Sequence, residues 1–150
     1  MHSSAGNFDI ARTLLERFLI KNPNSVEALA AIGYVSIEQG RFEDAEVALK
    51  KAITLDGGDI ASLFDYARLA VKQKNYAEAV ARLEKVVALN RVNPQVHYQL
   101  FLAYSRLKLT DKANTALAEF KRLDALEKQA TQERIMDEKL RAQKLLGQSP

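Results

Sequence analysis

Cysteine is absent from the 150-residue sequence, which excludes disulfide bonds and thiolate metal sites. Proline and glycine are scarce, with three and six residues, while 47% of all residues are hydrophobic. No apolar run is long enough to span a bilayer and no signal peptide is visible, so we expect no membrane insertion. These features indicate a small soluble helical domain with one continuous core, and they fit the cytoplasm and a bacterial envelope equally.

A strong charge of one sign is also lacking. The 22 basic and 19 acidic residues give a formal net charge of +3 without a concentrated basic face, so we expect no nucleic acid partner. The sequence has no His-Glu-x-x-His spacing and no glycine-rich phosphate loop, so the familiar metal and nucleotide signatures are missing. We therefore expect a chain that is not an enzyme, with no catalytic residue, no cofactor and no metal site.

What the sequence does contain is a repeat of 34 residues, whose three units begin at Val26, Ile60 and Pro94. A period of this length indicates stacked helix pairs. The residue before each unit is a good helix N-cap, because its short side chain can accept a hydrogen bond from the first turn; these residues are Ser25, Asp59 and Asn93. The spacing therefore predicts three helices that start in phase.

Each unit continues with an apolar helix face, a turn and a second helix. The offset of Leu29 and Leu63 is occupied by His97 in the third unit, so we assign His97 a structural place in the core. In the turns, Gly40 and Asn75 are able to adopt the left-handed backbone that ends a helix.

The first unit carries Ile32-Gly33, then Phe42, and then a small and apolar set formed by Ala45, Leu49 and Ala52. At these offsets the chain resembles the tetratricopeptide repeat family, and the resemblance covers roughly residues 6–127. The third unit departs from the family pattern at Phe101, where a small residue is usual. The resemblance implies an all-α fold, an αα-superhelix (a solenoid) of about three helix pairs, with a half repeat before them and a long C-terminal helix after them.

The half repeat is the segment 6–22, which matches the second helix of a unit whose first helix is missing. We interpret residues 1–5 as an expression remnant and expect them to be disordered. The repeats are expected at 25–58, 59–92 and 93–127. Either an upstream helix is missing, or a second copy covers the apolar residues of the half repeat, which would make a homo-oligomer through Phe8, Leu15, Phe18 and Leu19.

Residues 128–150 are rich in charged helix formers, and no helix breaker occurs before Gly147. We expect a capping or extension helix with a disordered end. The alternative is a coiled-coil or partner-docking segment, which the cluster of Ile135, Met136 and Leu140 favours.

In the family, the first helix of each pair lines the inner, concave wall of the superhelix. Carried onto this sequence, the resemblance predicts a peptide-binding groove that contains Tyr34, Ile37, Phe64, Arg68, Val71, Tyr98, Leu102 and Arg106. Aromatic rings can bury a large area there, and Arg68 can grip a carboxylate. The expected partner is another protein that offers an extended or helical peptide segment.

The leading hypothesis is thus a non-catalytic protein–protein interaction module. A second is a structural module that self-assembles through the half repeat or the last helix. A third is a helical appendage of a larger enzyme.

Overall fold

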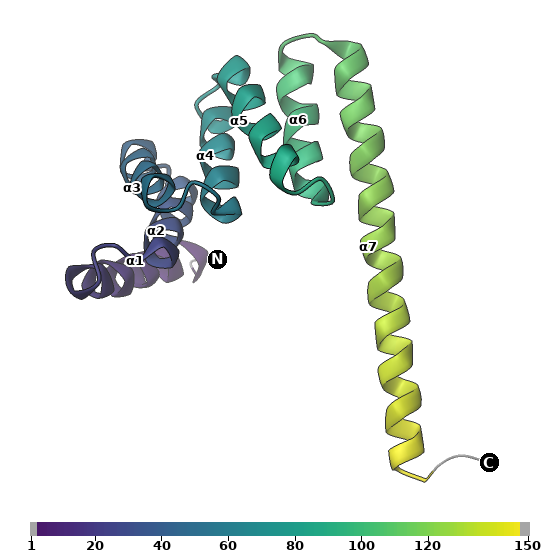
Figure 1. The fold of residues 1–150 in the computed structure, drawn as a ribbon. Helices are drawn as coiled ribbons and strands as arrows, with labels where there is room; N and C mark the ends of the chain where they lie inside the picture. The colour runs from purple at the N-terminus through teal and green to yellow at the C-terminus, as the bar shows by residue number, and fades with distance from the viewer. Residues whose placement is uncertain (1–2, 148–150) are drawn as a thin grey trace.

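The computed structural model describes residues 3–147 and folds that range into seven α-helices with no strand (Figure 1). Each helix contacts the next one along the chain. The bounds are α1 (Ser3–Lys21), α2 (Val26–Glu38), α3 (Phe42–Leu55), α4 (Ile60–Lys72), α5 (Tyr76–Leu89), α6 (Pro94–Arg106) and α7 (Thr110–Leu145). The predicted all-α stack of three helix pairs, with one helix before it and a long helix at its end, is confirmed.

The first helix of each pair begins at a side-chain cap, as predicted. Ser25 accepts a hydrogen bond from the N–H of Ala28 at 3.2 Å, and Asp59 accepts one from that of Ser62 at 3.1 Å. Asn93 accepts a hydrogen bond at 2.9 Å from the N–H of Gln95, the second residue of α6. These contacts satisfy N–H groups that have no partner within the helix, so they fix where α2, α4 and α6 start.

The turn inside each pair contains one residue with left-handed backbone, again at a spacing of one repeat. These residues are Gly40 (φ 74°), Lys74 (φ 63°) and Lys108 (φ 59°). The prediction for Gly40 is confirmed, whereas the prediction for Asn75 is wrong, because Asn75 has φ −94° and is the N-cap residue before α5. In all three turns the left-handed residue lies two residues before the second helix, so the length of the repeat outweighs the preference of asparagine.

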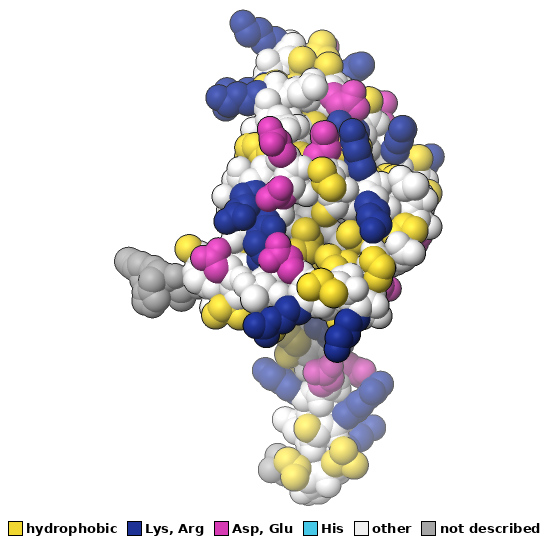
Figure 2. All heavy atoms as spheres, turned by 90° about the vertical axis from the view of Figure 1, so that its left-hand side faces the viewer, with side chains coloured by type: hydrophobic (Ala, Val, Ile, Leu, Met, Phe, Trp, Pro, Cys, Tyr) yellow, Lys and Arg dark blue, Asp and Glu magenta, His cyan; other side chains and the backbone are white. Residues whose placement is uncertain are grey.

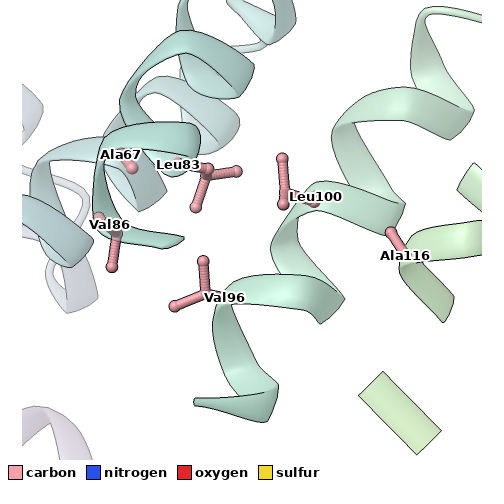
Figure 3. Packing of buried hydrophobic residues seen from close by; sticks show 6 residues of the cluster. All are labelled: Ala67, Leu83, Val86, Val96, Leu100 and Ala116. Carbon is pink, nitrogen blue, oxygen red and sulfur yellow. The ribbon is translucent and has the colours of Figure 1, made fainter. Parts of the chain in front are cut away.

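The core runs continuously between the pairs. Figure 3 shows how one buried cluster joins four helices, with Ala67 from α4, Leu83 and Val86 from α5, Val96 and Leu100 from α6, and Ala116 from α7. Within the first pair, a Cβ atom added to Gly33 would lie 2.5 Å from the side chain of Leu49. Glycine at this position therefore lets α2 and α3 approach closely.

Contacts between neighbouring pairs show which way the stack curves. Helix α2 contacts α4 and α4 contacts α6, whereas within residues 3–147 α3 does not contact α5 and α5 does not contact α7. Helices on the inside of a curved stack approach one another more closely than those outside. The set α2, α4 and α6 is therefore the inner layer.

Helix α1 packs against α2 in the place of the predicted half repeat. It begins at Ser3, so the expectation of disorder for residues 1–5 is wrong for residues 3–5, and residues 1–2 lie outside the described part. The single Gly6 does not interrupt α1, whose helical backbone begins at Ser3. Arg12 anchors the helix: its Nε donates to Gln39 Oε1 at 2.8 Å, and its Nη2 donates to Ser36 Oγ at 2.5 Å.

Helix α7 completes the third pair and then continues as a single helix to Leu145. Every residue from 125 to 147 is exposed, so the final ~20 residues extend about 30 Å beyond the helix stack. Ion pairs along the helix accompany this segment, among them Lys128–Asp124 at 3.0 Å and Arg141–Asp137 at 3.1 Å. The helix ends before Gly147, whose φ is 69°, and the predicted disordered end at 148–150 lies outside the described residues.

Candidate functional site

The site residues predicted from the sequence all lie on α2, α4 and α6, the inner layer, and we call the surface of these helices the inner wall. Their exposure differs widely. Tyr34 is 45% exposed and Arg106 is also exposed. The others, apart from Ile37, are half-buried, namely Phe64, Arg68, Val71, Tyr98 and Leu102.

Ile37 does not lie on the inner wall surface. Its side chain is only 3% exposed and packs in a buried cluster with Leu49 of α3 and Leu69 of α4. The next pair of helices covers this position, so the assignment of Ile37 to the groove is contradicted by its burial.

Tyr34 and Arg68 come together across the junction between the first two pairs. The Arg68 guanidinium lies 5.4 Å from the centroid of the Tyr34 ring, a cation–π arrangement. Arg68 Nη1 also donates to Glu38 Oε1 at 3.0 Å, and its Nε donates to Asp65 Oδ1 at 3.3 Å. Arg68 is thus already paired with two carboxylates, so it is not free to grip a ligand carboxylate as the sequence suggested.

Burial dominates the electrostatics around Arg68. The side chains of Arg68 and Asp65 are 14% and 13% exposed, and Arg68 Nη2 is buried without a hydrogen-bond partner. Desolvation raises the pKa of Asp65, and the opposing attraction of Arg68 is the smaller effect. With Glu38 included, one cation faces two acids, so this end of the inner wall does not favour an anionic ligand.

Aromatic rings at the other end of the inner wall fill gaps between helices. The Tyr98 ring centroid lies 5.2 Å from that of Phe120 on α7 and 6.1 Å from that of Phe101. Phe64 packs against the buried cluster of Figure 3. Of the three predicted aromatic anchors, Tyr34 is therefore the one that is exposed, whereas Phe64 and Tyr98 are half-buried.

Exposed basic side chains lie on the same layer. Lys72 and Arg106 end α4 and α6 at a spacing of one repeat, and neither forms an ion pair within residues 3–147. The corresponding residue of α2 is Glu38, which binds Arg68. The inner wall therefore carries its unpaired positive charge toward the C-terminal repeats.

A hollow of about 530 Å³ between α6 and α7, reaching α5, was not predicted from the sequence. Its lining includes Glu84, His97, Tyr104, Asp111, Lys112 and Glu119. His97 is half-buried here, with Nε2 3.1 Å from the carbonyl oxygen of Arg91, so its assignment to the core is wrong. Only the packing of three helices creates this hollow, and no single-helix pattern reveals it.

Two titratable groups of the α6–α7 hollow have shifted pKa values. Burial raises the pKa of Tyr104, and the neighbouring Glu84 adds to that shift. A hydrogen bond from Arg122 lowers the pKa of Glu119. Over the described range, no group of three or more histidine or acidic residues is placed to hold a metal ion, and no helix is long and apolar enough to cross a membrane.

Comparisons with known proteins agree with the geometry of the stack. Two family models described as tetratricopeptide repeat match residues 2–60 and 36–100. Human tetratricopeptide repeat protein 21B is 30% identical over 103 residues, which cover 69% of this chain and 8% of that protein. A chloroplast PsbD mRNA maturation factor of Chlamydomonas reinhardtii is 26% identical over 124 residues, which cover 79% of this chain and 9% of that protein. The chain thus spans less than a tenth of the length of these relatives.

Solved structures show the same fold. A crystal structure of MamA superimposes with a TM-score of 0.71 at 28% identity, over 79% of this chain and 69% of that one. A thermophilic repeat protein of Thermus thermophilus gives a TM-score of 0.72 at 23% identity, over 80% and 68% of the two chains. The in-phase caps, the curved stack and the two family matches lead to one conclusion: this chain belongs to the tetratricopeptide repeat family, whose repeats generally act as protein–protein interaction modules.

Proposed function

We propose that this chain is a non-catalytic interaction module that holds an extended or helical segment of a partner protein against the inner wall. The observation that carries the proposal is the exposed Tyr34 ring on the inner layer. The ring is held from two sides, by an edge-to-face contact with Phe8 at 6.3 Å and by the Arg68 guanidinium. A fixed, exposed aromatic ring loses little entropy on binding, as binding hot spots require.

The chemistry of the inner wall suggests the character of the segment. An apolar side chain would pack on Tyr34, where the carboxylates around Arg68 disfavour an acidic residue. An acidic residue of the segment would instead lie toward Lys72 and Arg106. This arrangement would give the bound segment one preferred direction.

The experiment is a selection of binding segments from a random peptide library, followed by affinity measurements on matched variants. Tyr34→Ala removes the exposed ring from the inner wall, while Val47→Ala removes an exposed apolar side chain from the outer helix α3. We expect Tyr34→Ala to weaken binding of the selected segments by about 30-fold, since a hot spot is worth about 2 kcal/mol, and Val47→Ala to leave it unchanged.

The charge of the inner wall is tested in the same assay. We expect the double variant Lys72→Glu, Arg106→Glu to weaken acidic segments, and Lys51→Glu on α3 to have no comparable effect. A library that yields no binder, or binders that Tyr34→Ala and Val47→Ala affect equally, would contradict the proposal.

A further inference from the structure

Helix α1 carries a row of exposed apolar side chains that do not pack against α2. The half-buried side chains of α1, which include Phe8 and Leu19, face α2. On another side of the helix lie Ile10, Leu14 and Phe18, which are 60%, 58% and 49% exposed. Figure 2 looks onto this end of the molecule and shows hydrophobic side chains gathered among charged ones. We call these three residues the α1 stripe.

The exposed apolar residues of α1 differ from those predicted to form an oligomer, which were Phe8, Leu15, Phe18 and Leu19. Of these four residues only Phe18 is exposed, because the other three are half-buried on the side that meets α2. Ile10 and Leu14 were not singled out from the sequence. Their i, i+4 spacing with Phe18 is the signal that would have found them.

The α1 stripe is more apolar than a junction between repeats of this chain. One and two periods along the chain, Ile10 corresponds to Asp44 and Glu78, both of them exposed. Asp44 lies at the junction between α1 and α3, where its Oδ2 is 3.9 Å from Arg12 Nη2. The internal junction of α1 with α3 therefore places an acidic residue at this position, and the isoleucine of α1 indicates an apolar neighbour.

The α1 stripe is also complementary to itself. Ile10 and Phe18 lie four residues on either side of Leu14, so two antiparallel copies of α1 can pair around a two-fold axis through Leu14. In that arrangement Leu14 meets Leu14 of the second copy, and Ile10 meets Phe18 of the second copy. We propose that the chain forms a homodimer through the α1 stripe, with Leu14 at the two-fold axis.

The charges beside the α1 stripe favour the antiparallel direction. Arg17 and Lys21 flank its C-terminal half, and Asp9 lies beside Ile10 at its N-terminal half, where its Oδ1 also accepts a hydrogen bond from Gln39 Nε2 at 2.6 Å. Antiparallel pairing brings the basic side chains of one copy toward Asp9 of the other, whereas parallel pairing would place like charges side by side. The dipoles of antiparallel helices also oppose each other favourably.

The first test measures molar mass by sedimentation equilibrium over a range of concentrations. We expect the parent chain to approach twice its mass of 16.8 kDa, and Leu14→Glu to remain at 16.8 kDa. Ile135→Glu, which changes an exposed residue of α7 outside the α1 stripe, should still dimerise. A parent chain that is monomeric at every concentration, or a dimer that Leu14→Glu leaves intact, would overturn the proposal.

The absence of cysteine allows a second test that does not depend on disrupting the surface. Leu14→Cys should form an intermolecular disulfide on mild oxidation, because the two residues meet at the axis. Ile10→Cys alone should not, since eight residues of helix, about 12 Å, would separate the two thiols. A mixture of Ile10→Cys and Phe18→Cys chains should cross-link. If Leu14→Cys reacts no faster than Val47→Cys on the outer helix α3, the two-fold pairing is wrong.

Discussion

Arg12 of α1 donates a hydrogen bond to Ser36 of α2, with 2.5 Å between Nη2 and Oγ. Ser36 is fully buried and the Arg12 side chain is only 11% exposed. The small serine leaves room for the guanidinium to enter between helices. This contact joins the half repeat to the complete repeats through a polar group, as Arg68 and Glu38 do at the junction between the first two pairs.

Removing this guanidinium should destabilise the fold. We expect Arg12→Ala to lower the free energy of unfolding by about 2–3 kcal/mol, because it breaks charged hydrogen bonds and leaves the Ser36 hydroxyl buried without a partner. Urea unfolding followed by circular dichroism measures the change. Lys51→Ala on the exposed face of α3 is the control, with an expected change under about 0.5 kcal/mol. An equal effect of both variants would show that Arg12 is not an anchor.

Two glycines within helices should respond in opposite ways to the same substitution. Gly33→Ala adds a Cβ that would lie 2.5 Å from Leu49, so we expect a loss of about 1–3 kcal/mol despite the better helix propensity of alanine. Gly6→Ala in α1 meets nothing within 4 Å and should raise the stability by about 0.5–1 kcal/mol. Thermal and urea unfolding of the two variants provide the comparison. Changes of the same sign would contradict the close approach of α2 and α3.

The left-handed lysine in the second turn should be improved by glycine. Lys74 has φ 63°, a backbone conformation that is costly for residues with a Cβ, so Lys74→Gly should stabilise the protein by up to about 1 kcal/mol. Lys85→Gly, in the interior of α5, should cost about 1 kcal/mol because glycine is a poor helix former. Equilibrium unfolding of both variants checks the signs. A destabilising Lys74→Gly would show that the left-handed backbone is not strained.

The free energy of unfolding should depend on pH because of the shifted pKa of Asp65. Desolvation raises its pKa above the ordinary value of 3.8, so the folded state holds this proton more tightly than the unfolded state does. Its stabilising contribution is therefore full below pH 3.8 and is lost as the pH rises through the folded-state pKa.

The stability difference between the parent chain and Asp65→Asn isolates this contribution. We expect the parent chain to lose stability relative to Asp65→Asn as the pH increases from 3.8 toward neutrality. Denaturant unfolding at several pH values measures the difference. If the parent chain instead gained relative stability with rising pH, the ion pair with Arg68 would outweigh burial.

The sequence predicted the features that depend on one helix at a time. The caps at Ser25, Asp59 and Asn93 and the three in-phase helix pairs could be predicted because hydrogen bonds and apolar periodicity are local. Ile37 could not be placed correctly, since its burial depends on how the next pair, with Leu69, lies over it.

The candidate site shows the same division. Asp65 stands three residues before Arg68, a helical spacing that could have pointed to this ion pair but was not used. The pairing with Glu38 spans 30 residues and depends on the packing of α2 against α4. Asn75 was predicted instead of Lys74 because asparagine adopts left-handed backbone more readily than lysine. That prediction did not take into account that the left-handed residue has a fixed position within each repeat.

The projecting half of α7 affects how the size of this molecule must be measured. A compact chain of 150 residues has a radius of gyration of about 15 Å, and a helix that extends about 30 Å from the repeats makes the molecule far less compact. Such a particle experiences more friction than its mass implies. A column calibrated with compact proteins would therefore read one copy as something larger, and only a method that weighs the particle independently of its shape can count the copies.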